Sequence, residues 1–194
     1  MLKVITPPAV EPVTLADVQA QTVVAPNADD ALLLIAISAV RAHGEALTRR
    51  SWAPQTIEVV LDGFPYGKIE LPNGPVTSIT SVSYLAADGT ETVLDTALYD
   101  IDIDSLVASV APIYGTSWPE TANKPNAVRV RYEAGWKDVD FPPALKQWML
   151  VMIASFYAQR ENHVVGFSVG QKVAAMPRGF CDALLDNFIV PGGI

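Results

Sequence analysis

Apolar residues recur with a helical period in two parts of the chain. The first run lies within residues 31–47, and the second within residues 145–157. The apolar residues of the first run are Leu32, Leu33, Leu34, Ile35, Ile37, Val40 and Leu47. Those of the second run are Leu145, Trp148, Met149, Met152, Ile153, Phe156 and Tyr157. This spacing predicts two long helices. Because the apolar residues of the first helix occupy more than one of its faces, we expect that helix to lie between neighbouring elements.

Sequence signals mark where the helices start. Thr14 followed by Asp17 predicts the capped start of a short helix. The Thr14 side-chain oxygen can accept a hydrogen bond from a free N–H of the first turn, and the Asp17 carboxylate is favoured at the positive end of the helix dipole. Residues 27–30, Asn-Ala-Asp-Asp, predict the start of the first long helix. Pro142 and Pro143 predict the start of the second, because proline is tolerated in a first turn. Three prolines within residues 1–13 predict an extended arm, and residues 180–188 predict a last short helix.

Between residues 51 and 140 the apolar period changes to two. Apolar and polar residues alternate in three stretches: Ile57, Val59 and Leu61; Tyr99, Ile101 and Ile103; and Val128, Val130 and Tyr132. Residues 72–75 predict a turn, and residues 87–89 predict a hairpin turn between residues 81–85 and 90–94. Ile79 and Val82 lie three positions apart, which predicts a bulge. The region is therefore predicted to form an antiparallel sheet with one solvated face.

The helices thus flank a β insert. The predicted fold class is α+β, in which a discontinuous helical bundle of N- and C-terminal helices carries an inserted antiparallel β-sheet region. The helical domain is predicted to comprise residues 1–50 and 141–194, and the inserted β domain residues 51–140. A chain of 194 residues is long enough to bury a substantial core without a disulfide or metal.

Composition and charge exclude several classes of protein. The chain is 50% hydrophobic and 18% charged, which excludes an intrinsically disordered chain, and no stretch reaches about 20 consecutive apolar residues. Its N-terminus has no secretory signal pattern. The net charge is −8, and residues 51–140 contain five basic and thirteen acidic residues, while the remainder contains eight of each. Duplex-binding proteins carry basic stripes, so we expect weak affinity for DNA.

Catalytic motifs are few. Residues 166–170, Gly-Phe-Ser-Val-Gly, match the G-x-S-x-G pattern of serine hydrolases. That chemistry needs a strand before the serine and a histidine after it, whereas His43 and His163 both precede Ser168. A glycine loop is the favoured interpretation, and a serine hydrolase is kept as an alternative. The single cysteine, Cys181, excludes an internal disulfide and a multi-cysteine zinc site.

Asp100, Asp102 and Asp104 imitate the start of a calcium-binding loop. The glycine and the glutamate that such a loop needs are replaced by Ser105 and Ala111. We expect the three aspartates to form the solvent face of a strand, with a weak cation site left open. No enzymatic activity, cofactor or metal is predicted.

Residues 162–175 have an alternating pattern between two predicted helices. The segment has no sequential hairpin partner, and Lys172 is the only charged residue between Glu161 and Arg178. We expect it to become ordered on assembly by adding a strand to a neighbouring subunit or a tail protein. The residues predicted to form this partner interface are Arg160, Glu161, Val165, Phe167, Val169 and Val173.

Several sequence pieces, taken in order, resemble one family. They are residues 13–19 (VTLADVQ), 29–33 (DDALL), 75–84 (PVTSITSVSY), 88–90 (DGT), 99–102 (YDID), 128–135 (VRVRYEAG), 143–146 (PALK) and 157–161 (YAQRE). Their order and spacing resemble those of phage head–tail connector proteins, the head-completion or adaptor proteins of long-tailed phages and prophages. The resemblance spans nearly the whole chain. Gln19 and Gln21 stand where the family would lead us to expect basic residues.

The resemblance implies a structural virion protein located in the neck between capsid and tail, and in the host cytoplasm during assembly. Its implied partners are further copies of itself in a ring, expected to be dodecameric, the portal protein, and a downstream tail or head-closure protein. DNA would pass through the ring without specific binding, and no membrane is involved. Another tail-completion or adaptor protein of a virion is the alternative.

Overall fold

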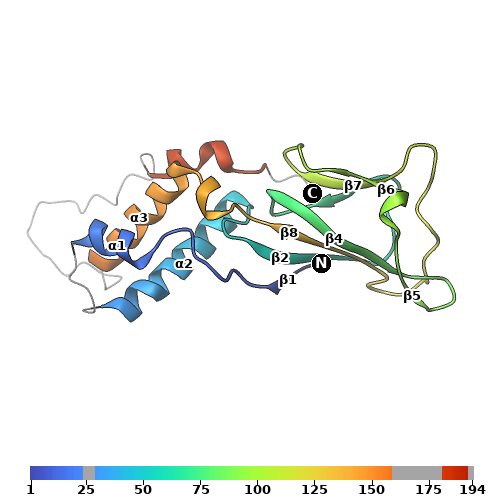
Figure 1. Ribbon diagram of the computed structural model, residues 1–194, viewed down its shortest axis with the longest axis horizontal. Coiled ribbons are helices and arrows are strands. Elements are labelled where there is room, and N and C mark those ends of the chain that lie inside the picture. Colours follow the sequence, from blue (N-terminus) through green and yellow to red (C-terminus); the bar gives the residue numbers. More distant parts are fainter. Residues whose placement is uncertain (24–28, 159–180, 192–194) are drawn as a thin grey trace, which may run out of the picture. The chain divides into compact units, whose positions relative to one another are not determined.

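The computed structural model describes residues 1–23, 29–158 and 181–191 (Figure 1). The chain divides into two compact units. The sheet unit contains Met1–Val10, Arg49–Val139 and Val190–Ile194, and the helical unit contains Glu11–Thr48 and Asp140–Ile189. Helices and antiparallel sheets are both present, which confirms the predicted α+β class.

The sheet unit contains two antiparallel sheets. In the larger sheet the strand order is β1 (Leu2–Thr6), β2 (Gln55–Leu61), β8 (Val128–Ala134), β4 (Val76–Leu85) and β5 (Glu91–Val93). In the smaller sheet the order is β3 (Ile69–Leu71), β7 (Ala108–Pro112) and β6 (Tyr99–Asp102). Short 3-10 turns, η1 (Thr96–Leu98) and η2 (Asp138–Asp140), precede β6 and follow β8.

The strand register forms apolar rows across the larger sheet. One row consists of Leu2, Val59, Val130 and Val82, and the next of Val4, Ile57, Tyr132 and Ile79. The smaller sheet adds Ile69, Leu71, Tyr99 and Val110 to the same buried cluster. The two sheets therefore pack against each other through these rows, and alternation along each strand places the intervening residues on the opposite face.

The predicted turns of the sheet are largely confirmed. β4 pairs with β5 through the hairpin, with Ser83 opposite Val93. The register of β4 against β8 shifts between Ile79 and Ser81, where the bulge was predicted. Two expectations were wrong. Leu2–Thr6, predicted only as an extended arm, is a strand of the larger sheet. Ile101 and Ile103 are about half exposed instead of buried, because β6 is an edge strand and only Tyr99 reaches the core.

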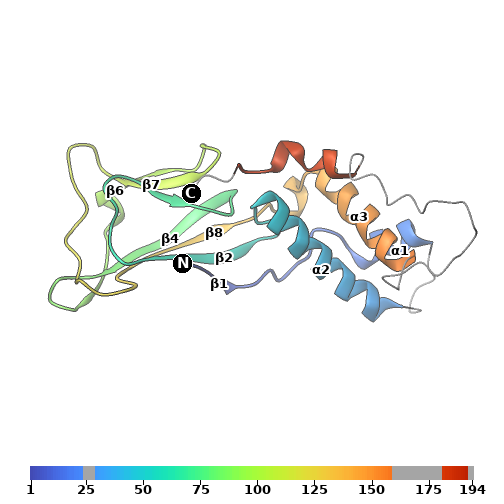
Figure 2. The ribbon, with the colours of Figure 1, turned by 180° about the vertical axis from the view of Figure 1, so that it is seen from behind.

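The helical unit contains α1 (Leu15–Thr22), α2 (Asp30–Thr48) and α3 (Pro143–Ala158), and α2 lies beside α3 in both views (Figures 1 and 2). The predicted cap of α1 is confirmed: Thr14 Oγ1 accepts from the Asp17 N–H at 3.1 Å, and Asp17 Oδ2 accepts from the Thr14 N–H at 3.0 Å. Of the last predicted helix, residues 180–188, the described part has a helical Cys181 followed by two 3-10 turns, η3 (Asp182–Leu184) and η4 (Asp186–Phe188).

Polar contacts connect segments of the helical unit around its buried interior. Arg41 donates to Glu11 and to Glu45, both at 2.7 Å. Tyr157 donates its hydroxyl proton to Asp29 Oδ2 at 2.6 Å, and Lys146 lies 3.0 Å from Asp17 Oδ2. The buried residues between the helices are Val18, Leu33, Ile37, Val40, Leu145, Trp148, Met149 and Ile153. The helices thus pack through an apolar interior, and the hydrogen bonds and ion pairs lie around it.

Candidate interaction surfaces

The six residues predicted to form a partner interface, Arg160, Glu161, Val165, Phe167, Val169 and Val173, lie outside the described residues. Ser168 with its flanking glycines and His163 also lie outside them. The predicted strand addition and the alternative of a serine hydrolase therefore stay predictions.

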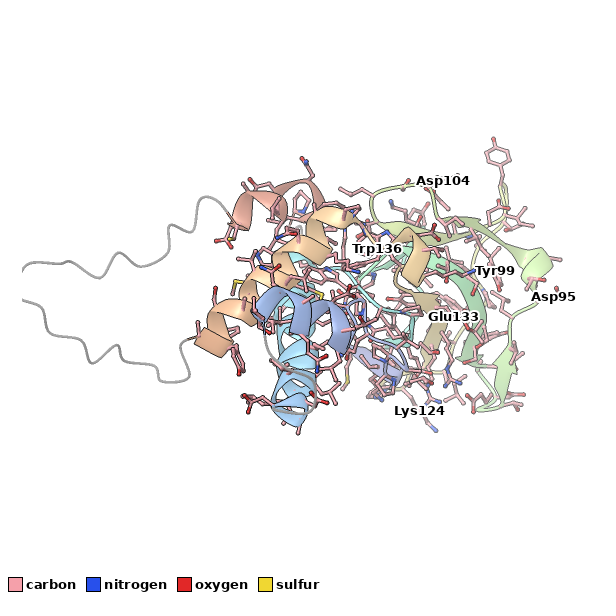
Figure 3. All side chains as sticks on the ribbon, turned by 60° about the vertical axis from the view of Figure 1, so that its left-hand side comes forward. Asp95, Tyr99, Asp104, Lys124, Glu133 and Trp136 are labelled. Carbon is pink, nitrogen blue, oxygen red and sulfur yellow. The ribbon has the colours of Figure 1, made fainter. Side chains whose placement is uncertain are left out.

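The described part of the chain has no arrangement of residues typical of a metal site. No group of three or more His, Cys, Asp or Glu side chains within it could hold a metal ion. His43 is exposed on α2, where its ring stacks on that of Trp148 with centroids 6.2 Å apart. Cys181 is half-buried. In Figure 3 the labelled acidic residues of the sheet unit, Asp95, Asp104 and Glu133, lie well apart.

Several aspartates of the sheet unit serve turns. Asp102 accepts from the N–H groups of Asp104 and Ser105 through Oδ1, and from the Ser105 hydroxyl through Oδ2 at 2.6 Å. These bonds, that of the Ser105 hydroxyl above all, lower the pKa of Asp102. Asp88 accepts from the Thr90 N–H and Asp95 from the Ala97 N–H, each at 2.9 Å. Part of the acidity of residues 51–140 is therefore turn chemistry, in which a side chain bonds to the backbone two residues on.

One face of α2 is apolar and uncovered. Leu33, Ile37 and Val40 are buried, but Leu34 is 53% exposed and Ile35 is 66% exposed. Leu32 on the same helix is 43% exposed. In the described chain α2 contacts two neighbours, α1 and α3, which bury Leu33 and Ile37 but leave Leu34 and Ile35 exposed. Adjacent exposed Leu and Ile residues are typical of a surface that another protein covers.

By length and composition α2 could also span a bilayer, because an 18-residue stretch of this helix has a mean hydropathy of 1.4. A single helix of this kind is weak evidence, because core helices pass the same test. In this helix Arg41 and Glu45 form an ion pair, and Arg41 also contacts Glu11. These contacts within the unit favour packing against protein.

An apolar trough lies in the sheet unit, beside the first strand. Its volume is about 510 Å³, and its apolar walls include Leu2, Val59, Leu71, Leu106 and Val107. Arg49 and Glu70 also line it. The first strand has little sequence signal, because Leu2, Lys3 and Val4 give only three residues of period two before Ile5 breaks the alternation.

Comparison with known proteins gives a match in fold. No protein-family model matches the chain, and no curated protein matches it. A chain in the neck of an empty gene transfer agent particle, computed with C6 symmetry, has a TM-score of 0.80 and 21% identity, covering 100% of this chain and 97% of that one. Chains in the virion of the native gene transfer agent particle, and in the neck of that particle computed with C12 symmetry, give TM-scores of 0.78 at the same identity and coverage. The chain therefore has the fold of these neck and virion chains over its whole length.

Proposed function

We propose that this chain is a head–tail connector subunit that forms a ring in the neck of a tailed phage or phage-like particle. The ring would lie under the portal, join the DNA-filled capsid to the tail, and let DNA pass. The observation that carries the proposal is the whole-length likeness in fold to chains from the neck of gene transfer agent particles. The connector-like order of sequence pieces across the chain supports it independently.

The exposed face of α2 supplies a contact surface of the kind that a ring needs. A closed ring of identical subunits is built from heterologous contacts, in which each subunit offers two different surfaces. Leu34 and Ile35 are mostly exposed beside a buried Leu33, so covering them costs no change in the fold of α2. We propose that a neighbouring subunit covers them in the ring.

The negative charge of the chain is consistent with a ring whose inner surface lets DNA pass without binding it. The net charge is −8, and the excess of acidic residues lies within residues 51–140. Like charges repel the phosphate backbone, so a surface of this composition does not retain DNA. Some of these aspartates, such as Asp88 and Asp102, also accept hydrogen bonds within turns.

Particles made without this protein test the proposal. In a host that produces the particle, deletion of the gene should leave DNA-filled heads and separate tails, and a wild-type copy should restore joined particles in electron micrographs. Heads that join to incomplete tails would instead indicate a tail-completion protein. Joined and infectious particles would contradict the proposal altogether.

The ring itself is tested with the purified chain and the portal protein of the same genome. Native mass spectrometry and electron microscopy should show a closed ring of many copies on the portal, with the portal alone as the control. Only two-fold dimers at every concentration, with the portal present, would contradict the proposed ring.

A further inference from the structure

β1 is an open sheet edge of a different kind from the other edges of the sheet unit. β5 has three residues, and its Glu91 lies 3.4 Å from Arg129. β3 also has three residues and carries Glu70 beside Lys68, while β6 carries two aspartates. Short and charged edges are the usual protection against added strands. β1 has five residues, all exposed, and Lys3 is its only charged side chain.

The register of β1 shows which of its backbone groups point outward. Met1 and Val60 exchange both of their backbone hydrogen bonds, at 2.7 and 2.8 Å. Hydrogen-bonded and non-bonded pairs alternate along an antiparallel ladder, so Lys3 is bonded to β2, and the N–H and C=O groups of Leu2 and Val4 point away from it. Within the described chain, β1 has β2 as its only strand neighbour.

The side chains of the same two residues continue the core. Leu2 ends the apolar row of Val59, and Val4 ends the row of Ile57. Val59 is 6% exposed and Ile57 is fully buried, whereas Leu2 is 37% and Val4 is 54% exposed. Leu2 and Val59 line the apolar trough, so the first of the two rows runs out of the covered core into an apolar opening.

We propose that the free edge of β1 receives residues 164–170 of a second copy of this chain as an added strand. This inference rests on the proposed function, since the ring brings copies together. Val165, Phe167 and Val169 alternate with Gly166 and Ser168, so a strand of this segment has one apolar face and one of small residues. Its apolar face extends the rows of Leu2 and Val4, the first of them over the trough, and main-chain bonds to those two residues hold it there.

Two properties favour this segment as the occupant. Residues 162–177 contain a single charged side chain, Lys172, which matches an apolar opening. Each copy also offers one edge and one segment, which is the one-to-one, heterologous contact that closes a ring. β1 and the stretch from Val165 to Val169 each have five residues, so the ladder is complete along β1.

Disulfide trapping between two singly labelled full-length chains tests the inference. Both chains carry Cys181→Ser. One carries Val4→Cys, and the other carries a cysteine at Val165, Phe167 or Val169, or at Ser168. Paired residues of neighbouring strands have Cα atoms about 5.5 Å apart, within the range of a disulfide. We expect mild oxidation to join Val4→Cys to at least one position of the apolar set, and not to Ser168→Cys.

A reciprocal pair gives the matched control. Lys3 lies on the opposite face of β1, so Lys3→Cys should join to a cysteine at one of the small residues Gly166, Ser168 or Gly170, whichever the register places opposite it, and not to Phe167→Cys. No cross-link at any position, or equal yields from both faces, would overturn the inference. So would cross-links that form only when both cysteines are in one chain, because the segment would then occupy its own edge.

Native mass spectrometry of the same mixtures separates this inference from the proposed function. Rings that form without the cross-links would leave the connector proposal standing and refute the added strand. Cross-linked copies that never close into rings would refute the ring and retain the strand exchange.

Discussion

Replacing Ile35 by aspartate should weaken assembly without unfolding the subunit. Ile35 is 66% exposed on α2, so its removal leaves the buried interior of the helical unit unchanged. Substitutions at such surface positions usually alter the free energy of unfolding by less than about 0.5 kcal/mol. The melting temperature of Ile35→Asp should therefore stay within a few degrees of wild type.

The effect on assembly follows from the exposed fraction. Full burial of an isoleucine side chain contributes about 1.5–3 kcal/mol, so covering the exposed two thirds contributes about 1–2 kcal/mol to each subunit contact. Ile35→Asp removes this gain and adds the cost of desolvating a carboxylate. A loss of about 2 kcal/mol raises the dissociation constant of one contact about 30-fold, and ring closure compounds it.

Sedimentation velocity over a range of concentrations, together with thermal melting, measures both quantities. The matched control is Ile37→Ala on the same helix, where the side chain is 1% exposed. This variant should lose about 2–5 kcal/mol of stability. Wild-type assembly by Ile35→Asp would refute the assignment of α2 to a subunit contact, and a large loss of its melting temperature would refute the claim that Ile35 is outside the core.

Three further outcomes are expected. Gly135 has φ +115°, and a Cβ there would collide with the carbonyl of Ala53, so Gly135→Ala should lower the free energy of unfolding by about 3 kcal/mol or more in a urea titration. Gly89 has φ +89° with open space around it, so Gly89→Ala should lower that free energy by only about 1–2 kcal/mol. Equal losses for the two variants would contradict the collision. The hydrogen bond from the Thr14 N–H is the largest cause that lowers the pKa of Asp17, so the carboxylate stabilises the fold above the unfolded pKa, and this stabilisation is lost as the pH falls through the folded pKa. Asp17→Asn should therefore lower the free energy of unfolding by about 0.5–1 kcal/mol at pH 7 and by almost nothing at pH 2. An equal loss at both pH values would contradict this prediction. Random duplex DNA should bind weakly and with a shallow salt dependence in fluorescence anisotropy, and submicromolar, salt-sensitive binding would contradict the role assigned to the acidic surface.

The sequence predicted those features that are formed by contacts between residues only a few positions apart. Thr14 and Asp17 cap a helix through bonds three residues apart, so the capping box was readable. The bulge was also readable, because it shifts the apolar alternation between Ile79 and Val82. The hairpin at residues 87–89 follows from its turn residues. In each case the determining contacts lie within a few positions of the signal.

The errors concern contacts with distant parts of the chain. Ile101 alternates correctly, but its exposure depends on whether a further strand covers β6, which no local pattern records. β1 was missed because its partner, β2, begins about 50 positions later. Apolar residues were detected on more than one face of α2, but such a pattern does not distinguish a neighbour in the same subunit from one in another.

The larger sheet determines how the subunit carries mechanical force. Thr6 of β1 lies opposite Thr56, and Gln55 of β2 lies opposite Ala134 of β8, so these three adjacent strands all lead into the helical unit from the same end. Tension transmitted between the units then pulls three neighbouring strands in the same direction. Because hydrogen bonds in the ladder run across the strands, such a pull produces little shear between them. Within the larger sheet three backbones then share the tension in parallel, and under the proposed function this is the tension between capsid and tail.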